Sequence, residues 1–414
     1  MPSRIIVEMG LNILELTHNW PAETFIQRHI RALQDANLSV QVVARHATEA
    51  IRASASLGVE DDVIHARVMP NFNHLNWTGK LSSLRHITVN SLFSKSIPAL
   101  SEKMLLGFFE RLHPHLIHFH TASLASSMAW IPNALGVPYT LSLRGSDVQV
   151  IPYQSPAQKE ATISAIKGAE KVHSVCYAIG RTAAQLLDEE LNFSVIYTTL
   201  PVLPDLPDRE DMKVDGQFHF ISSGRLVWHK GFNNLMIAFR SLRDTTMNAK
   251  LTIFGTGPDL EQLLYLRKAL RLEADVNFPG KSTYGQIQEA FKIAHAYVQS
   301  SLAEGLSNSL AEAMANGLPA FATDVGGTRE VIEDGVTGYL LPPFAPHEWA
   351  AILLRIKDVP VIKQIRQAAY EESKHRFCDK SHASAFSLFY SEALRDFKGK
   401  GEDEHVVDIY GRQK

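Results

Sequence analysis

Short apolar, β-branched runs alternate with helix-like patterns along almost the whole chain. In the first 200 residues the strand-like runs lie at residues 5–7, 40–43, 116–119, 139–143, 172–175 and 195–197. Between them, apolar residues recur at helical spacing, as in residues 24–35 and 157–167. Strands that alternate with helices in this way predict βαβ units and therefore a parallel sheet.

A second series of the same kind follows. Its strand-like runs lie at residues 218–222, 250–254, 276–278, 296–299, 320–323 and 338–341, and its helical patterns at residues 233–243, 260–270 and 284–294. Between the two series, residues 201–216 combine prolines with many acidic side chains, which is typical of a linker. We therefore predict an α/β protein with two Rossmann-like, doubly wound domains that face a cleft, at residues 1–200 and 217–381.

Composition narrows the function classes. The 414 residues suit two domains of ordinary size, and the formal net charge of −3 gives no support to nucleic-acid binding. No apolar run is long enough for a membrane span, and no secretory signal is apparent at the N-terminus. The two cysteines, Cys176 and Cys378, lie far apart without metal-ligand spacing, which favours a reducing, cytoplasmic environment.

Residues 301–342 contain the clearest chemical pattern. Glu304 and Glu312 are separated by seven residues, directly before and within an apolar helical run. The residues between them that we expect at the helix start are Leu306, Ser307, Asn308 and Ser309. Free backbone N–H groups at a helix start can bind an anion, and carboxylates on either side can accept hydrogen bonds from hydroxyls. The segment therefore predicts a site for a sugar nucleotide.

Two cations and two glycines extend this pattern upstream. Arg225 and Lys230 follow the predicted strand at residues 218–222, where a guanidinium and an ammonium suit a diphosphate. Two solvated surface cations are the alternative. Gly255 and Gly257 follow the next strand, and they permit either the close approach of a ligand or a simple turn.

These motifs resemble those of glycosyltransferase family 4, a large group of retaining enzymes with the GT-B fold. The resemblance rests on the Glu-x7-Glu segment, on FISSGRLVWHKG at residues 220–231, on LTIFGTG at residues 251–257 and, more diffusely, on residues 20–33. It implies that Arg225 and Lys230 bind the donor's diphosphate and stabilise the leaving nucleotide, with no obligatory metal ion or other cofactor. It further implies that Glu304 lies near the donor sugar and that Glu312 contacts the ribose.

Further roles follow from the resemblance alone. The backbone at Gly280 and Lys281 would reach the nucleotide base, and a C-terminal helix within residues 382–414 would pack back on the first domain. The implied reaction moves a sugar from a UDP- or GDP-sugar to a hydroxyl of a glycan or lipid-linked acceptor, in bacterial surface polysaccharide or lipopolysaccharide synthesis. A GT-B nucleotide-sugar epimerase and a non-catalytic sugar-nucleotide-binding scaffold remain the alternatives.

The N-terminal half departs from the family pattern at one point. Many relatives have His-Gly-x-Asp after the strand that matches residues 139–143, whereas this chain has Arg144 in place of the histidine, followed by Gly145, Ser146 and Asp147. The role of that histidine therefore does not transfer. We place Arg144 and Asp147 on the acceptor side, where Arg144 either binds an anionic group or forms an ion pair with Asp147.

Three histidines are further candidates in this half. His118 and His120 share one face of a predicted strand, and we expect at least one of them to be exposed in the cleft with a catalytic role, the alternative being two core histidines. His18 precedes the first helix and is a similar acceptor-side candidate.

A basic, aromatic segment at residues 76–95 is the last candidate. It contains Lys80, Arg85, His86 and Lys95, and it either rests on the inner membrane as a peripheral contact or forms a solvated helix face.

Overall fold

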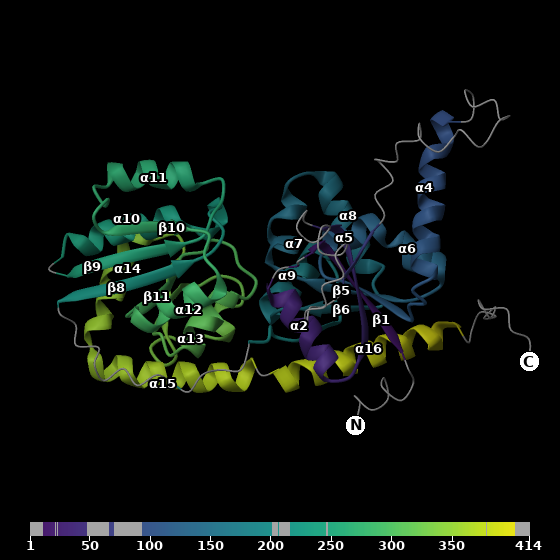
Figure 1. The fold of residues 1–414 in the computed structure, drawn as a ribbon. Helices are drawn as coiled ribbons and strands as arrows, with labels where there is room; N and C mark the ends of the chain where they lie inside the picture. The colour runs from purple at the N-terminus through teal and green to yellow at the C-terminus, as the bar shows by residue number, and fades with distance from the viewer. Residues whose placement is uncertain are drawn as a thin grey trace, which may run out of the picture.

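The computed structural model describes residues 11–20, 22, 24–47, 66–69, 93–200, 206, 216–245, 247–377 and 379–401. Within these residues the chain forms two parallel sheets, each covered by helices, which lie side by side (Figure 1). The α/β prediction of two Rossmann-like units is confirmed. The predicted strand at residues 5–7, residues 76–92 of the basic segment, almost all of the linker and Cys378 lie outside the described residues.

The first sheet has seven strands in the order β3-β2-β1-β4-β5-β6-β7, and all neighbours are parallel. Their bounds are β1 Asn12–Trp20, β2 Ser39–Ala47, β3 Ala66–Val68, β4 Leu116–Phe119, β5 Tyr139–Leu143, β6 Lys171–Ser174 and β7 Phe193–Val195. The strand order reverses between β1 and β4. Strand β1 was not predicted, because Glu15 and Thr17 place polar side chains in a strand that is buried.

The second sheet has six strands in the order β10-β9-β8-β11-β12-β13, again all parallel. Their bounds are β8 Gln217–Ser223, β9 Asn248–Phe254, β10 Val276–Gly280, β11 Ala296–Gln299, β12 Ala320–Thr323 and β13 Tyr339–Leu341. Here the order reverses between β8 and β11. Ligands of doubly wound sheets bind beyond the carboxyl ends of the strands at such a point, which directs attention to the loops after β8 and β11.

Helices cover both sheets. In the first half these are α2 Thr24–Asp35, α4 Phe93–Glu110, α5 Ala122–Met128, α6 Trp130–Leu135, α7 Gly145–Gln149, η4 Ile151–Tyr153, α8 Pro156–Lys167 and α9 Tyr177–Leu187. In the second half they are η5 Trp228–Lys230, α10 Phe232–Arg243, α11 Leu260–Ala269, α12 Tyr284–Ile293, α13 Asn308–Ala315, η6 Thr328–Glu330, α14 Pro346–Leu353, η7 Leu354–Lys357, α15 Val359–Arg376 and α16 Asp379–Gly401. Among the described residues, none of these helices has the length and apolarity that crossing a bilayer requires.

The last two helices run beneath both sheets. Figure 1 shows α15 under the second sheet and α16 under the first. Phe386, Phe389 and Tyr390 of α16 are buried in one apolar cluster with Leu11 and Ile13 at the start of the first sheet. Burial of such side chains stabilises the fold by about 2 kcal/mol each, so α16 is an integral part of the first domain's core.

Candidate active site

A cavity of about 470 Å³ lies between the two halves of the chain, within the usual size range of ligand sites. Its wall includes the loops that follow β5, β8 and β11 and the start of α13. Of the residues singled out from the sequence, those on the wall are Arg144, Arg225, Lys230, Glu304, Leu306, Ser307, Asn308 and Ser309. The predicted cleft therefore exists, and both domains contribute to it.

Helix α13 begins at the wall of this cavity. Ser307 is the N-cap, and its hydroxyl accepts a hydrogen bond from the backbone N–H of Leu310 at 3.3 Å. The next two residues, Asn308 and Ser309, also line the cavity. The positive end of the helix dipole and its free N–H groups therefore lie where an anionic ligand can reach them.

Lys230 and Glu304 form an ion pair at the same wall, and both side chains are mostly buried. The hydroxyl of Ser301 donates a second hydrogen bond to the same carboxylate oxygen at 3.1 Å. The loop itself is anchored by the backbone N–H of Gly327, which donates to the Gly305 carbonyl at 2.8 Å. A carboxylate held by a cation and a hydroxyl in a fixed loop is preorganised to interact with a positively charged reacting centre.

Arg225 is exposed on the cavity wall, and the glycines near it have a packing role. A Cβ atom on Gly255 would collide with the Gly224 carbonyl, and one on Gly257 would collide with the Leu226 carbonyl. The loop around Arg225 can therefore approach the turn after β9 only because both positions lack a side chain. Neither glycine lines the cavity, which favours the simple turn over a ligand contact.

The segment predicted to reach the base lies outside the cavity wall. Gly280 accepts a hydrogen bond from the N–H of Gly255 at 3.0 Å through its carbonyl, and Lys281 is exposed. Their contact with a base remains a prediction.

Glu312 is bound by the opposite domain. The guanidinium of Arg28, on α2, lies 2.8 Å from its carboxylate and 5.2 Å from the ring centroid of Tyr284. Burial raises the pKa of Glu312, and the charge of Arg28 opposes this shift. Glu312 belongs to the predicted motif, but its pairing with Arg28 could not be predicted, because Arg28 lies 284 residues earlier in the chain and no motif marks it.

A second carboxylate also joins the domains. Glu330 accepts hydrogen bonds from the backbone N–H groups of Tyr177 and Ala178 at 2.9 and 2.8 Å, and from the hydroxyl of Tyr197 at 3.0 Å. Its carboxylate thereby caps the N-terminus of α9, although it belongs to the opposite domain. The backbones of Gly145 and Gly305 meet nearby, so closely that a Cβ on Gly145 would collide with Gly305. The domains are closed onto each other at these contacts.

Arg144 lines the cavity from the acceptor side. Its guanidinium lies 4.0 Å from the ring centroid of Phe25, and its Nε donates to the His120 carbonyl at 3.3 Å. Asp147 is fully buried and accepts hydrogen bonds from the backbone N–H groups of Arg144 and Ala122 at 2.9 and 3.0 Å. Burial raises the pKa of Asp147 to about 6, although both hydrogen bonds lower it. The predicted acceptor contact of Asp147 is therefore corrected: it caps α7 from inside the protein.

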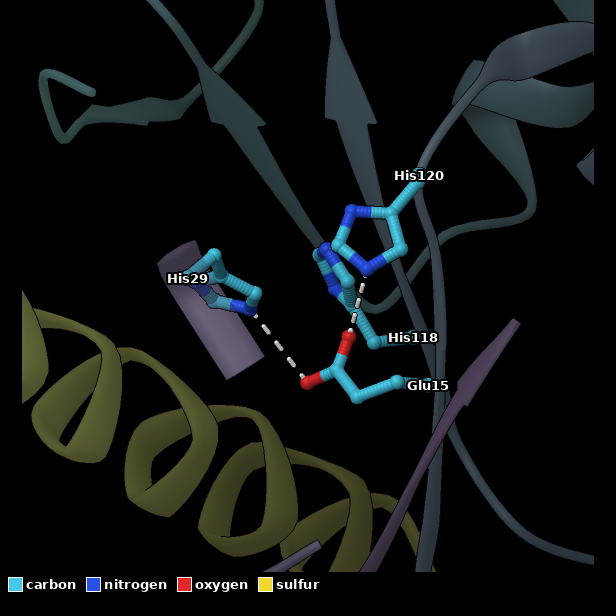
Figure 2. Close-up of side chains that lie close together, drawn as sticks. All are labelled: Glu15, His29, His118 and His120. Atoms are coloured by element: carbon cyan, nitrogen blue, oxygen red, sulfur yellow. Dashed lines mark ion pairs between the residues drawn. The ribbon is translucent and has the colours of Figure 1, made fainter. Parts of the chain in front are cut away.

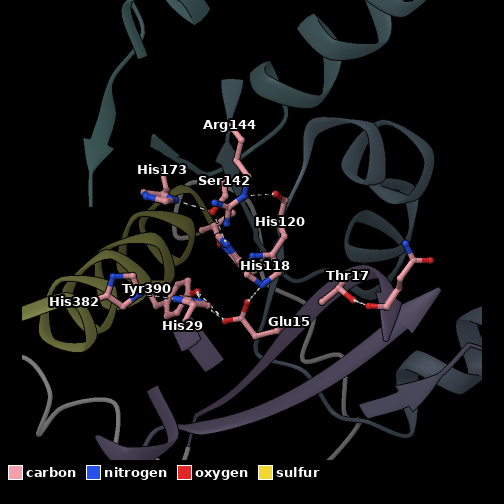
Figure 3. Close-up of polar contacts among 12 residues, drawn as sticks. Glu15, Thr17, His29, His118, His120, Ser142, Arg144, His173, His382 and Tyr390 are labelled. Carbon is pink, nitrogen blue, oxygen red and sulfur yellow. Dashed lines mark hydrogen bonds and ion pairs between the residues drawn. The ribbon is translucent and has the colours of Figure 1, made fainter. Parts of the chain in front are cut away.

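His118 and His120 lie on one face of their strand, with ring centroids 4.9 Å apart, as alternation predicts. Both are buried, at 0% and 1% exposure, so the expectation that one of them reaches the cleft is wrong. Phe386 and Tyr390 of α16 pack against the ring of His118, and Figure 3 shows Tyr390 on this side of the cluster. His120 packs against the rings of His118 and His29. Neither histidine is therefore placed to contact a substrate directly.

His18 is partly exposed beside the cavity. Its Nε2 lies 3.0 Å from the hydroxyl of Ser123 and 3.2 Å from that of Thr121, and Thr121 itself lines the cavity. An acceptor contact by His18 remains a prediction.

Comparisons with known proteins agree with this geometry. The family described as "Glycosyl transferases group 1" matches residues 208–376, and a "Glycosyl transferase 4-like domain" matches residues 22–190. The N-acetyl-alpha-D-glucosaminyl L-malate synthase of Bacillus anthracis is 24% identical over 327 residues, which is 75% of this chain and 84% of that protein. TuaC of Bacillus subtilis (strain 168), assigned to teichuronic acid biosynthesis, is 28% identical over 294 residues, 69% of this chain and 72% of that one.

A solved structure gives the same result for the fold. Anabaena HepE in complex with UDP-glucose superposes with a TM-score of 0.72 at 17% sequence identity, covering 92% of this chain and all of that one. The two family matches together cover most of both sheets, and curated relatives and the shared fold extend over most of the chain. This chain is therefore a GT-B glycosyltransferase of the group 1 family, and it belongs with the enzymes of the family 4 type.

Proposed function

We propose that this enzyme transfers a sugar from a UDP- or GDP-sugar to a hydroxyl of a glycan or lipid-linked acceptor, with retention of the anomeric configuration. One observation carries the proposal. Arg225, Lys230, Glu304 and the start of α13 converge on a single cavity between the domains. A diphosphate, a sugar and an acceptor hydroxyl need these groups together.

The positive groups define where the diphosphate binds. Arg225 and Lys230 supply two positive charges, and the first turn of α13 adds backbone N–H groups. When the glycosidic bond breaks, negative charge grows on the leaving diphosphate, and fixed cations stabilise it without reorganisation. These groups carry the charge that a metal ion would otherwise supply, so we infer a transfer step with no obligatory metal ion or other cofactor.

The two glutamates act at different parts of the donor. Glu304 lies on the cavity wall, where its carboxylate can stabilise the positive charge that develops on the donor sugar. Its ion pair with Lys230 holds it in place before the donor arrives. Glu312 binds the ribose hydroxyls, and to do so it exchanges the guanidinium of Arg28 for them.

Arg144 selects the acceptor. Its guanidinium lies against Phe25 on the N-terminal side of the cavity, in the position where relatives have histidine. A guanidinium there suits an acceptor that carries a carboxylate or phosphate. The Bacillus anthracis relative is named for a product that contains L-malate, a dicarboxylate, and TuaC for teichuronic acid biosynthesis. We therefore place the reaction in the assembly of anionic bacterial glycans or glycosides, with an acceptor that lies in the membrane as one option.

Two measurements test this function. Thermal unfolding is followed with UDP, GDP, ADP and their sugars, because a ligand at a hundred times its dissociation constant adds about 2.7 kcal/mol to the free energy of unfolding. The donor so identified is then incubated with acidic and neutral acceptors, and NMR of the product's anomeric proton reports its configuration. Retained configuration supports the proposal. An inverted product removes the retaining mechanism, and nucleotide binding without any transfer favours a scaffold.

A further inference from the structure

Beneath the acceptor side of the cavity lies a buried cluster with no part in the transfer step. Glu15 on β1, His29 on α2, and His118 and His120 at the end of β4 have exposures of 0, 4, 0 and 1%. Their potential ligand atoms all lie within 4.8 Å of one another. Figure 2 shows His29 and His120 directed at the two carboxylate oxygens of Glu15 from different sides. The cluster sits where the strand order of the first sheet reverses, between β1 and β4.

Hydrogen bonds fix which nitrogen of His29 carries its proton. The backbone carbonyl of Tyr197 lies 2.9 Å from Nδ1 of His382, so Nδ1 is the donor and Nε2 of neutral His382 is an acceptor. That Nε2 lies 2.9 Å from Nδ1 of His29, which must therefore donate to it. In a neutral ring, the other nitrogen of His29, Nε2, then carries a lone pair, and the hydroxyl of Tyr390 lies 3.5 Å from it.

This lone pair faces a carboxylate. Nε2 of His29 lies 3.4 Å from Oε1 of Glu15, which also accepts a hydrogen bond from the hydroxyl of Tyr390 at 2.8 Å (Figure 3). The other oxygen, Oε2, lies 2.9 Å from Nε2 of His120. Within the described residues, neither Oε2 nor either ring nitrogen of His120 makes a hydrogen bond of acceptable geometry. A buried carboxylate with an oxygen that lacks a well-aligned donor is strongly unfavourable, and a cation bound between it and the imidazole nitrogens removes that cost.

We propose that Glu15, His29 and His120 bind one divalent transition-metal ion, for which zinc is the best chemical match. Two imidazole nitrogens and the two oxygens of one carboxylate give four donor atoms of the types that zinc prefers. Two ligands of a tetrahedral zinc ion with bonds of about 2.1 Å lie about 3.4 Å apart, which is the separation of His29 and Glu15. A charge-assisted N–H···O bond would be shorter, at about 2.8 Å. His120 has to withdraw by roughly half an ångström.

His118 is not one of the ligands, because both its nitrogens are engaged. The carbonyl of Ile196 fixes the proton of His173 on Nε2, so Nδ1 of His173 accepts from the hydroxyl of Ser142 at 2.7 Å. Ser142 then accepts from Nε2 of His118 at 2.9 Å, and Thr140 donates to Nδ1 at 2.8 Å. His118 thus forms part of the wall around the ion.

The surroundings of the proposed ion resemble those of other metal centres. His29 donates its Nδ1–H to His382, and Tyr390 donates a hydrogen bond to the carboxylate of Glu15, so two ligands are held by a further layer of hydrogen bonds. The ion would join β1, α2 and β4 beneath α16. Arg144 donates a hydrogen bond to the backbone carbonyl of His120. By fixing His120, the ion would therefore also help to hold Arg144 in position. This inference does not depend on the proposed transfer reaction.

The test is the metal content of the full-length enzyme, purified without a polyhistidine tag and dialysed after exposure to zinc. Elemental mass spectrometry should find about one zinc per chain in the wild type. The content should fall at least tenfold in Glu15→Gln and in His29→Gln. The exposed His347 provides the matched control, since His347→Gln should retain the metal. Circular dichroism establishes that each variant is folded.

A second measurement covers the case in which a variant fails to fold. Cobalt(II) added to the metal-depleted wild type should give the visible absorption of a four-coordinate site, and zinc should abolish it. A wild type that holds no metal and gives no cobalt spectrum overturns the proposal. NMR titration would then show His29 as an imidazolium, with a proton in place of the metal ion. Equal zinc in the wild type and in folded His29→Gln also overturns it, because the ion then binds elsewhere.

Discussion

The two domains handle their polar side chains in opposite ways. In the C-terminal domain, the chemically active side chains lie on loops at the cavity wall, as Arg225, Lys230 and Glu304 do. In the N-terminal domain, most of the striking polar groups are beneath the wall, as His118, His120 and Asp147 are. The first arrangement binds a charged ligand directly. The second supports a surface from below, whereas Arg144 reaches the cavity itself.

The largest effect is expected at Glu304. Glu304→Gln should reduce turnover by about 100-fold or more, because its carboxylate stabilises charge that develops only in the transition state. The affinity for free nucleotide should not fall, since Lys230 is released from its ion pair and can bind the diphosphate. Steady-state kinetics and calorimetry measure the two quantities. Glu333 is exposed, so Glu333→Gln is the control and should leave turnover unchanged. An unchanged turnover in Glu304→Gln would contradict a catalytic role for this carboxylate.

The diphosphate site should show the next largest effect. Arg225→Ala or Lys230→Ala each removes a charge-assisted contact of about 1.5–3 kcal/mol, which corresponds to a loss of roughly 10–100-fold in the affinity for nucleoside diphosphate. Calorimetry with UDP and GDP measures it. Unchanged affinity in both variants would place the phosphates elsewhere.

The buried half should respond to pH instead. As the pH rises, the unfolded chain loses the proton of Asp147 near its ordinary pKa of 3.8, whereas the folded protein keeps it until about 6. The free energy of unfolding contributed by Asp147 should therefore fall by about 2 kcal/mol between pH 4 and pH 8. Denaturant titrations of the wild type and of Asp147→Asn, compared at both pH values, isolate this change. A constant difference between the two proteins would show that Asp147 titrates normally.

The C-terminal domain was also easier to predict from the sequence than the N-terminal domain. The predicted bounds of β4, β5, β11 and β12 agree with the structure, because buried parallel strands are continuous apolar runs. Other predicted strands differ from the observed ones at their ends. The C-terminal site was predictable because its residues lie in loops directly after such strands. Strand β1 and the burial of His118 were not, because both depend on α16, which covers the first sheet from more than 250 residues away.

Arg144 offers a way to sharpen the comparison, since it is a charged side chain of the N-terminal half that lines the cavity. Arg144→His restores the residue common among relatives. If Arg144 binds an anionic acceptor, the Michaelis constant for the acceptor should rise several-fold while that for the donor stays nearly constant. The loss corresponds to about 1 kcal/mol. Equal small changes in both constants would indicate that Arg144 only supports the wall through Phe25 and the His120 carbonyl.

The smallest effect, and the most direct link between the two halves, is expected at Arg28. Its guanidinium occupies Glu312, the carboxylate that we assign to the ribose, so the nucleotide has to compete with it. Arg28→Ala should therefore strengthen nucleotide binding by a few-fold, an amount of about 1 kcal/mol, while Glu312→Gln weakens it. The exposed Arg31 on the same helix is the control, because Arg31→Ala removes an equal charge without touching the cleft. Calorimetry with free nucleotide decides the matter. If Arg28→Ala weakens binding instead, Arg28 is part of the nucleotide site itself, and the N-terminal domain then takes a direct share in donor recognition.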